Sequence, residues 1–243
     1  MLEAKLSVTM PAHNEEANIE AVVRSCLEKL PGLVRDFEVV VVNDGSRDAT
    51  GQILDRLVAE DPHVVAIHHP VNRGYGDALM TGFSNTRGDF VMFMDSDRQF
   101  DIADLGRLLP YIGQYDVVAG YRLHRQDPPV RLLYARIFNL AIRIFFGIRV
   151  RDVDCAFKVF RGDLLRGMNL EIGGALINTE MLAKARRQGA TLTEVGVNHY
   201  PRVEGSQSGG SFKVVFRAMK NFWRLWWLMR TWTPSSGRVA AGR

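Results

Sequence analysis

The chain has 243 residues, 47% of them hydrophobic and 24% charged, which are the proportions of a globular protein with one large core or two smaller domains. Two cysteines without metal-ligand spacing argue against a disulfide framework and favour a reducing compartment. No signal-peptide pattern opens the sequence, and no charge-free apolar run approaches the about 18 residues of a membrane-spanning helix. We therefore do not expect an integral membrane protein.

The net charge of +4 is unevenly distributed along the chain. Residues 1–110 contain 10 Lys and Arg against 18 Asp and Glu, a net charge of −8. Residues 111–243 contain 21 Lys and Arg against 9 Asp and Glu, a net charge of +12. The basic second half predicts an anionic partner, for which nucleic acid and a phospholipid surface both qualify at this point.

The first half alternates short apolar runs with amphipathic segments. We predict strands over 6–10, 37–43, 64–69 and 89–94, and helices over 18–30, 49–59 and 77–85. This alternation indicates an α/β protein with a mostly parallel sheet and right-handed crossovers. Ligands of such sheets bind beyond the carboxyl ends of the strands. Those ends read PAHNEE, NDGSRD, HPVNRGYGD and DSDRQ, so we expect all four polar clusters on one rim.

The second half has a looser pattern and no internal repeat or long linker. We predict strands over 116–121, 155–160 and 191–197, and helices over 129–149, 178–188 and 212–232. A Gly/Ser-rich loop occupies 204–211, and the tail from 233 to 243 has the composition of a disordered segment.

The apolar run Phe90–Met94 ends in Asp95, Ser96, Asp97, Arg98 and Gln99. In an extended chain alternate residues point the same way, so Asp95, Asp97 and Gln99 would present three oxygen ligands on one side. Two close carboxylates repel each other unless a proton or a cation neutralises them. Such ligands suit Mg²⁺ or Mn²⁺, which share their remaining positions with substrate phosphates. Taken alone, the motif fits a solvated turn equally well.

Two further rim motifs have a structural and a functional interpretation. Asp44 opens a turn after a buried strand, and it could also accept hydrogen bonds from a nucleobase or ribose. Gly74 and Gly76 open a helix but lack the third glycine of a dinucleotide fingerprint. Arg73, beside these glycines and the helix start, could meet a diphosphate.

Six motifs follow one another along the chain: PAHNEE (11–16), VNDGSRDAT (42–50), NRGYGDALMTGF (72–83), DSDRQFD (95–101), GYR (120–122) and DVDCAFKVF (152–160). This ordered set resembles family 2 glycosyltransferases of GT-A fold, in particular dolichol-phosphate mannose synthase and the bacterial polyprenyl-phosphate glycosyltransferases. The resemblance covers about residues 5–210, and the set is far more specific than any one motif.

The resemblance implies a GT-A domain, a Rossmann-like α/β fold, over residues 1–211. Its nucleotide-binding half would be 1–110 and its acceptor half 111–211, followed by an amphipathic helix (212–232) and a disordered tail (233–243). The implied activity is metal-dependent, inverting transfer of a hexose from a nucleotide sugar, GDP-mannose or a UDP-sugar, to polyprenyl or dolichyl phosphate. The implied place is the cytoplasmic side, peripheral on the inner face of the membrane.

The resemblance also implies roles for single residues. The metal, Mg²⁺ or Mn²⁺, would be bound by Asp95, Asp97 and Gln99. The nucleotide sugar would be bound by Pro11, Ala12, His13, Glu15, Asp44, Arg73, Gly74, Asp77, Asp95 and Ser96. Mannose synthases usually have Pro-Thr-Tyr-Asn-Glu where this chain has Pro-Ala-His-Asn-Glu, which leaves the base open. Lys158 stands where relatives often have Arg. The exchange replaces a guanidinium group, which can donate two parallel hydrogen bonds, by a compact ammonium charge.

On the acceptor side, the resemblance implies that Arg122, Arg131, Arg202 and Ser206 hold the phosphate. A lipid phosphate is already anionic and needs cations rather than a strong base. A saccharide or glycolipid hydroxyl would instead need a carboxylate to take its proton, and Asp154 or Glu180 could serve. Glu180 is otherwise an exposed acid at a helix start. The predicted catalytic residues are thus Asp97, Arg122, Asp154, Glu180 and Arg202.

All four tryptophans lie in the predicted helix 212–232, and its basic residues recur on one face: Lys213, Arg217, Lys220 and Arg224. This pattern is typical of a helix at the interface of an anionic membrane. The segment 129–149 repeats it with Arg131, Arg136 and Arg143. Packing in the core or in a homodimer is the alternative.

Nucleic acid is a poorer explanation of the charge because no recognition module is present. A non-catalytic, membrane-surface nucleotide-binding subunit is the remaining alternative, and the intact Asp95-x-Asp97-x-Gln99 set counts against it.

Overall fold

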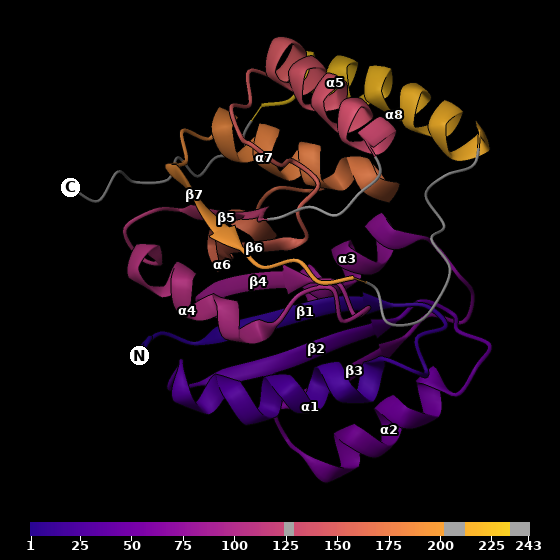
Figure 1. Cartoon of the computed structure of the whole chain (residues 1–243), viewed down its shortest axis with the longest axis vertical. Coiled ribbons are helices and arrows are strands. Elements are labelled where there is room, and N and C mark those ends of the chain that lie inside the picture. Colours follow the sequence, from indigo (N-terminus) through magenta and orange to yellow (C-terminus); the bar gives the residue numbers. More distant parts are fainter. Residues whose placement is uncertain (124–128, 202–211, 234–243) are drawn as a thin grey trace.

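The computed structural model describes residues 1–123, 129–201 and 212–233, and within these ranges it describes the backbone alone for 129–134, 175 and 212–219. The described residues build a seven-stranded sheet in the order β3-β2-β1-β4-β6-β5-β7 (Figure 1). Its strands are β1 (Leu6–Ala12), β2 (Phe37–Asn43), β3 (Val64–His68), β4 (Phe90–Met94), β5 (Val117–Arg122), β6 (Phe157–Arg161) and β7 (Leu192–Val197).

The sheet is mostly parallel, as predicted, with β6 reversed. β1 pairs in parallel with β2 and β4, β2 with β3, and β5 with β7. β6 lies antiparallel between β4 and β5. Two reversals in a row make β5 run in the same direction as β4. The carboxyl end of β5 at Arg122 therefore reaches the same rim as the end of β4 at Met94.

Helices cover both faces of the sheet (Figure 1). On one face α1 and α2 pack together, and on the other α3 packs against β1 and β2 and is followed by α6 and α7. All seven residues of β2 are buried because both faces are covered, which is why it has an almost unbroken apolar sequence. The bounds of these helices are α1 (Ile19–Lys29), α2 (Thr50–Glu60), α3 (Tyr75–Ser84), α6 (Gly162–Arg166) and α7 (Ile177–Arg187).

Two helices, α5 (Pro129–Phe146) and α8 (Phe212–Thr231), lie side by side as an outer layer beyond α7 (Figure 1). The ring of Phe145 meets the rings of Phe222 and Trp223 at centroid distances of 5.4 and 5.6 Å. Leu225 and Met229 of α8 are buried in the core. Helix α8 is therefore packed on the protein along one face, as the alternative interpretation of its sequence predicted.

The sequence predicts all the strands and long helices but misses two short helices. One is α4 (Leu105–Leu108), which two 3₁₀ turns flank, and the other is α6. The first of those turns, Ile102–Asp104, is capped by Asp101, whose carboxylate accepts a hydrogen bond from the backbone N–H of Ala103 at 2.9 Å. Segments of four or five residues are too short to show a helical period, so their sequence pattern could not identify them.

A buried ion pair attaches α7 to the preceding loop. Glu180 and Lys184 are both 0% exposed, and their charged atoms lie 2.7 Å apart. Glu180 also accepts hydrogen bonds from the backbone N–H groups of Glu171 (2.9 Å) and Ile172 (2.8 Å), while Lys184 donates to the carbonyl of Asn169 at 2.6 Å. Both predictions for Glu180 are therefore wrong: it is neither an exposed acid nor a base that an acceptor can reach.

Replacing Glu180 with Gln should lower the free energy of unfolding by about 3 kcal/mol, because the buried ammonium group of Lys184 would lose the carboxylate at 2.7 Å and keep only that of Glu171, at 3.7 Å. Urea denaturation followed by circular dichroism measures this change. The matched control is Glu3→Gln, which breaks an exposed pair with Arg35 and should leave stability close to that of the wild type. Equal effects of the two substitutions would contradict the structural role of Glu180.

Candidate functional site

The ends of β1, β2, β4 and β5 bring the predicted motifs to one rim of the sheet, because these four strands run in the same direction. The backbone N–H of Asp44, directly after β2, donates to the carbonyl of Ala12 at the end of β1 at 2.8 Å. The hydroxyl of Ser96, just after β4, donates to the carbonyl of Pro11 at 2.8 Å. Three loops that are distant in sequence are thus joined around the end of β1.

Asp44 is the centre of a hydrogen-bond network rather than a side chain that projects from the rim. Its carboxylate accepts from the backbone N–H groups of Arg73 and Gly74, both at 2.8 Å, and from Nδ1 of His69 at 2.8 Å. The hydroxyl of Thr81 donates to the other nitrogen of His69 at 3.0 Å. Burial alone would raise the pKa of Asp44, but these bonds outweigh it and hold the pKa below its ordinary value. Asp44 therefore shapes the loop that carries Arg73 and Gly74, and the predicted direct contact with a nucleotide is not tested.

Gly45 has a positive φ of 64°, and a Cβ atom there would lie 2.4 Å from the backbone of Val71 and Asn72. Only glycine allows the loop after β2 to come so close to the loop after β3. The glycine of VNDGSRDAT is therefore explained by packing between the two loops.

The segment 13–16 is joined to the loop after β2 by a second set of bonds. Nδ1 of His13 donates to the carbonyl of Asp44 at 2.8 Å. The backbone N–H of Asn14 donates to Ser46 at 2.9 Å, and that of Glu15 donates to Thr50 at 2.8 Å. The predicted nucleotide-binding residues Pro11, Ala12, His13 and Glu15 thus lie together with Asp44, and His13 is exposed at this position.

The extended geometry predicted for Asp95, Asp97 and Gln99 is wrong. β4 ends at Met94, and Arg98 has a positive φ of 63°, so the chain bends after Asp97. Asp97 accepts from the backbone N–H of Gln99 at 3.1 Å, as in an Asx turn. The side-chain nitrogen of Gln99 donates to the carbonyl of Tyr200 at 3.3 Å, so this amide is directed to the segment after β7. Asp95, Asp97 and Gln99 therefore do not form a row of three ligands on one side of an extended chain.

Carboxylates nevertheless gather at this point of the rim. The hydroxyl of Tyr75, at the start of α3, donates to Asp95 at 3.0 Å. Burial first, and then the negative charges of Asp95, Asp154 and Asp97, raise the pKa of Tyr75 well above its ordinary value. Two carboxylates from the end of β4 and a third from the loop before β6 thus act on one phenol.

These residues fit a divalent cation that arrives with a diphosphate. Within the described ranges, no three His, Cys, Asp or Glu side chains lie close enough together to hold a metal ion by themselves. Mg²⁺ in phosphate-transfer sites commonly needs only one or two protein carboxylates, because water and substrate phosphates complete its coordination. Asp95 and Asp97 would supply those carboxylates, and the metal would neutralise the charge of a leaving diphosphate.

Arg122, at the end of β5, is bound along one edge of its guanidinium group by a single acid. Its Nε and Nη2 donate to the two carboxylate oxygens of Asp152 at 2.6 and 2.8 Å. The Asp152 carboxylate raises the pKa of Arg122 although burial opposes this shift. The pair fixes a guanidinium group on the acceptor side of the rim and leaves Nη1 without a bonding partner among the described residues.

Lys158 supports the loop that carries Asp152 and Asp154. The residue is completely buried in β6, and its ammonium group donates to the carbonyls of Val153 (3.0 Å) and Cys155. Burial lowers the pKa of Lys158 and raises that of the neighbouring Cys155 thiol to about 12. Lys158 thus has a structural role, and Asp154, exposed on the same loop, is among the charges that raise the pKa of Tyr75.

For several other predicted site residues, the structure gives the position of the residue, or does not describe the side chain. Arg73 is exposed, and Asp77 lies in the first turn of α3 beside Gly173. Arg202 and Ser206 lie outside the described residues, and for Arg131 the backbone alone is described. Sequence reasoning assigned no role to Tyr75, Asp152 or His69. A signal was present for Asp152, because it stands two residues before Asp154 in a motif that had already been singled out.

The mostly parallel sheet with polar loops on one rim has the architecture of a GT-A domain. The family model of Glycosyl transferase family 2 matches residues 7–168, and the chain belongs to this family.

Two curated relatives match most of this chain. Glycosyltransferase AglD of Haloferax volcanii is 31% identical over 233 residues, which cover 92% of this chain and 37% of the relative. The undecaprenyl-phosphate 4-deoxy-4-formamido-L-arabinose transferase of Pseudomonas fluorescens is 30% identical over 214 residues, which cover 86% of this chain and 61% of that protein. The chain thus spans less than two thirds of the length of these relatives.

Among solved structures, glucosyl-3-phosphoglycerate synthase from Mycobacterium tuberculosis has the same fold. Its complex with Mn²⁺, UDP and glucosyl-3-phosphoglycerate superposes with a TM-score of 0.69 at 22% identity, covering 96% of this chain and 82% of the synthase. At this level of identity the likeness shows the fold alone.

Replacing Asp44 with Asn should lower the free energy of unfolding at pH 7 by about 2 kcal/mol, because three donors lose their charged acceptor. The difference from the wild type should narrow as the pH falls below the ordinary value of 3.8. A carboxyl whose pKa is lowered by folding contributes stability above its unfolded pKa, and it loses this contribution as it becomes protonated. Denaturant titrations at pH 7, 5 and 3 measure the effect, with exposed Asp55→Asn as the control. A difference that is constant or grows at low pH would rule out this network.

Proposed function

We propose that this chain transfers a hexose from a nucleotide sugar to a polyprenyl phosphate, with Mg²⁺ or Mn²⁺, at a membrane surface. The observation that carries the proposal is a rim on which Asp95, held by the hydroxyl of Tyr75 at 3.0 Å, and Asp97 follow the end of β4, while the fixed guanidinium group of Arg122 stands at the end of β5. Two relatives support the class of reaction, since one is named an undecaprenyl-phosphate sugar transferase. The synthase of the same fold has been solved with Mn²⁺ and UDP, which belong to the classes of metal and nucleotide that we propose for this chain.

On the donor side, the residues after β1 and β2 would bind the nucleoside, and Arg73 and the start of α3 would approach the diphosphate. The backbone N–H groups of Arg73 and Gly74 are bonded to Asp44, so this loop is already in place. A bound divalent cation would supply charge neutralisation for the departing nucleoside diphosphate. Asp95 would be held in one orientation by the hydroxyl of Tyr75. Preorganised groups of this kind favour the charge that develops as the sugar–phosphate bond breaks.

On the acceptor side, an oxygen of the lipid phosphate would form the new bond to the anomeric carbon. The bond from that carbon to the nucleoside diphosphate would break at the same time, which inverts the configuration. The acceptor oxygen is an anion, so no side chain has to remove a proton from it. Arg122 would orient the phosphate through the part of its guanidinium group that Asp152 does not use. Arg131, Arg202 and Ser206 remain proposed partners of the same phosphate.

A hydroxyl acceptor, in a saccharide or a glycolipid, is the alternative that one observation favours. Asp154 is exposed on the rim near the β4 carboxylates, where a general base for a hydroxyl would be needed. Glu180 does not qualify, because it is buried and paired. The nature of the acceptor therefore decides whether Asp154 takes part in the chemistry.

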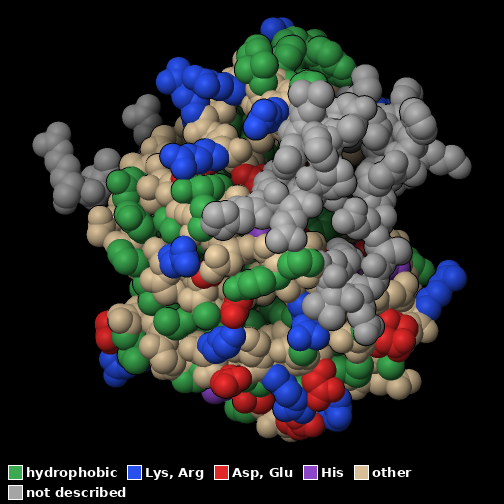
Figure 2. All heavy atoms as spheres, in the orientation of Figure 1, with side chains coloured by type: hydrophobic (Ala, Val, Ile, Leu, Met, Phe, Trp, Pro, Cys, Tyr) green, Lys and Arg blue, Asp and Glu red, His purple; other side chains and the backbone are tan. Residues whose placement is uncertain are grey.

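The outer layer of α5 and α8 supports the proposed membrane contact. Trp223 and Trp227 of α8 are 52% and 66% exposed, and Lys220 and Arg224 lie exposed on the same side of the helix. Figure 2 shows hydrophobic side chains gathered at the end of the molecule that these helices form, with Lys and Arg side chains nearby. Exposed aromatic and basic residues together suit the headgroup region of an anionic bilayer. None of the helices in the described part of the chain combines the length and apolarity needed to cross a bilayer.

The transfer reaction tests the proposal directly. Radiolabelled GDP- and UDP-sugars are incubated with the protein, polyprenyl phosphate and Mg²⁺ or Mn²⁺, and label that enters butanol is counted. We expect transfer from one donor, its loss in EDTA, and a reduction of about 100-fold or more in Asp97→Asn because charge stabilisation at the leaving group is lost.

Asp55→Asn, on the exposed side of α2, is the matched control and should retain activity. Full activity in EDTA or in Asp97→Asn would contradict the metal role. Label found in saccharide rather than in lipid phosphate would identify the hydroxyl acceptor. Nucleotide binding without any transfer would favour a non-catalytic subunit.

The proposed membrane contact through α8 can be tested separately, by vesicle binding. Trp223→Ser with Trp227→Ser should reduce sedimentation with anionic vesicles severalfold, because apolar burial is worth about 25 cal/mol per Å². High salt should weaken the binding of the wild type without abolishing it, since salt screens the basic residues alone. The control is Val58→Ser with Val65→Ser, two exposed apolar residues on α2 and β3. Unchanged sedimentation of the tryptophan variant, combined with a change from dimer to monomer, would make α8 a subunit interface instead.

A further inference from the structure

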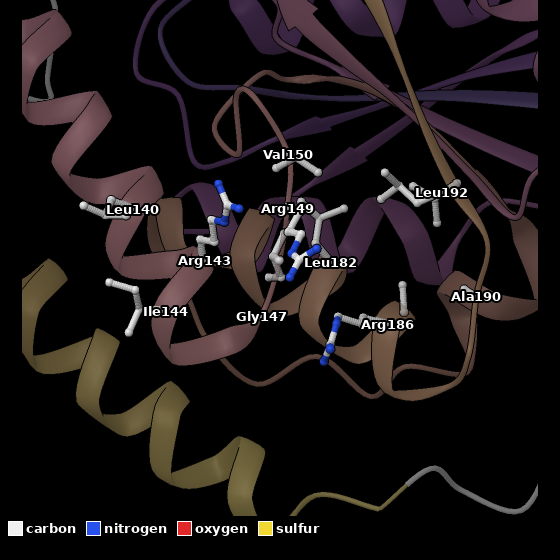
Figure 3. Close-up of a pocket in the computed structure, with 13 residues that line it drawn as sticks. Leu140, Arg143, Ile144, Gly147, Arg149, Val150, Leu182, Arg186, Ala190 and Leu192 are labelled. Atoms are coloured by element: carbon white, nitrogen blue, oxygen red, sulfur yellow. The ribbon is translucent and has the colours of Figure 1, made fainter.

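A pocket of about 710 Å³ lies between α5, α7 and the first residues of β5 and β7. Figure 3 shows its labelled side chains: Leu140, Arg143 and Ile144 come from α5, and Leu182 and Arg186 come from α7. Arg149 enters from the segment between α5 and β6. This volume is in the range of pockets that bind small molecules.

The pocket is set apart from the catalytic rim by the length of a strand. Val117 and Leu192, the first residues of β5 and β7, line it, whereas Arg122 at the other end of β5 belongs to the rim. Five residue steps along an extended strand correspond to about 17 Å. The pocket is therefore not part of the proposed donor or acceptor site.

Three guanidinium groups, those of Arg143, Arg149 and Arg186, line the pocket. Within the described part of the chain, no Asp or Glu forms an ion pair with Arg143, Arg149 or Arg186. The guanidinium group of Arg186 lies against Gly147, where a Cβ atom would be 3.0 Å from its Cζ. Gly147 has a positive φ of 68°, which favours glycine. The missing side chain also leaves room for the guanidinium group of Arg186. Unpaired arginines in one concavity indicate an anionic ligand, and their planar forks match phosphate oxygens.

The rest of the lining is apolar and continues to the surface. Leu182 and the buried Ile148 form part of the interior. Leu140 and Ile144 line the same pocket, yet they are 56% and 68% exposed. Together with Ile137, which is 56% exposed, they recur at helical spacing and form an exposed apolar side of α5, in the outer layer that α5 and α8 build. The pocket therefore opens onto the apolar surface that we assign to the membrane.

From this juxtaposition we infer that the pocket binds the phosphate headgroup of an anionic membrane phospholipid, with its chains directed along Leu140 and Ile144. A free phosphate would use the arginines but not the apolar exit, and an uncharged amphiphile would use the exit but not the arginines. The inference deepens the proposed membrane contact: it adds a specific headgroup site to the general attraction of basic and aromatic side chains. It does not depend on sugar transfer.

The test uses the full chain and dihexanoylphosphatidic acid at concentrations below those at which it forms micelles, with calorimetry as the readout. We expect saturable binding that is about tenfold tighter than that of inorganic phosphate or of dihexanoylphosphatidylcholine. The variant Arg143→Gln/Arg149→Gln/Arg186→Gln should lose about tenfold in affinity. Its matched control, Arg24→Gln/Arg35→Gln/Arg56→Gln, removes three positive charges from the acidic half of the chain and should bind like the wild type. Thermal melting of both variants confirms that they are folded.

Three results would overturn the inference. They are the absence of saturable binding by the wild type, equal affinity of the two triple variants, and inorganic phosphate binding as tightly as the short-chain lipid. Because the probe is a monomer in solution, failure here leaves vesicle binding through Trp223 and Trp227 untouched. Equally, failure of sugar transfer leaves this binding measurement valid.

Discussion

The concentration of negative charge around the hydroxyl of Tyr75 is the constraint on which the interpretation of the rim depends. Asp95, Asp97 and Asp154 all raise the pKa of this phenol. The nearby guanidinium group of Arg122 is already paired with Asp152, so it contributes little net positive charge. Like charges gathered in a partly desolvated place are stabilised by a counter-cation. A divalent metal that is shared with a substrate diphosphate would supply that charge, and this is why the proposed function fits the carboxylates better than a solvated turn does.

The loops of the rim are held by polar side chains that are themselves buried. Asp44 accepts from the backbone of the loop after β3, Lys158 donates to the backbone of the loop before β6, and Glu180 accepts from the loop before α7. A buried charge is tolerated only when hydrogen bonds replace its hydration, so each of these side chains has one favoured arrangement of its loop. Exposed residues such as His13 and Asp154 then project from a backbone that is already in place.

Much of this architecture could be predicted from the sequence, because strand and helix periods are local properties. The run 37–43 coincides with β2, and the polar clusters do meet on one rim. The bend after Asp97 could not be predicted, since it depends on the positive φ of Arg98 and on pairing with Tyr200, which is 101 residues from Gln99. The burial of Glu180 was equally hidden, because its partners come from a loop whose position is set by tertiary packing. The buried hydrogen bonds of Lys158 did have a local signal in the sequence. A charged residue within an apolar strand predicts that buried acceptors lie around it.

A crystal structure of the protein grown with Mn²⁺ and a nucleoside diphosphate would test the metal–diphosphate account most directly, because the anomalous signal of manganese locates the ion independently of the protein. We predict one strong peak within coordination distance of a carboxylate of Asp95 or Asp97 and of the diphosphate, with the nucleoside against the loops of His13 and Asp44. A diphosphate bound at the rim without the ion, or manganese bound away from β4, would contradict the account.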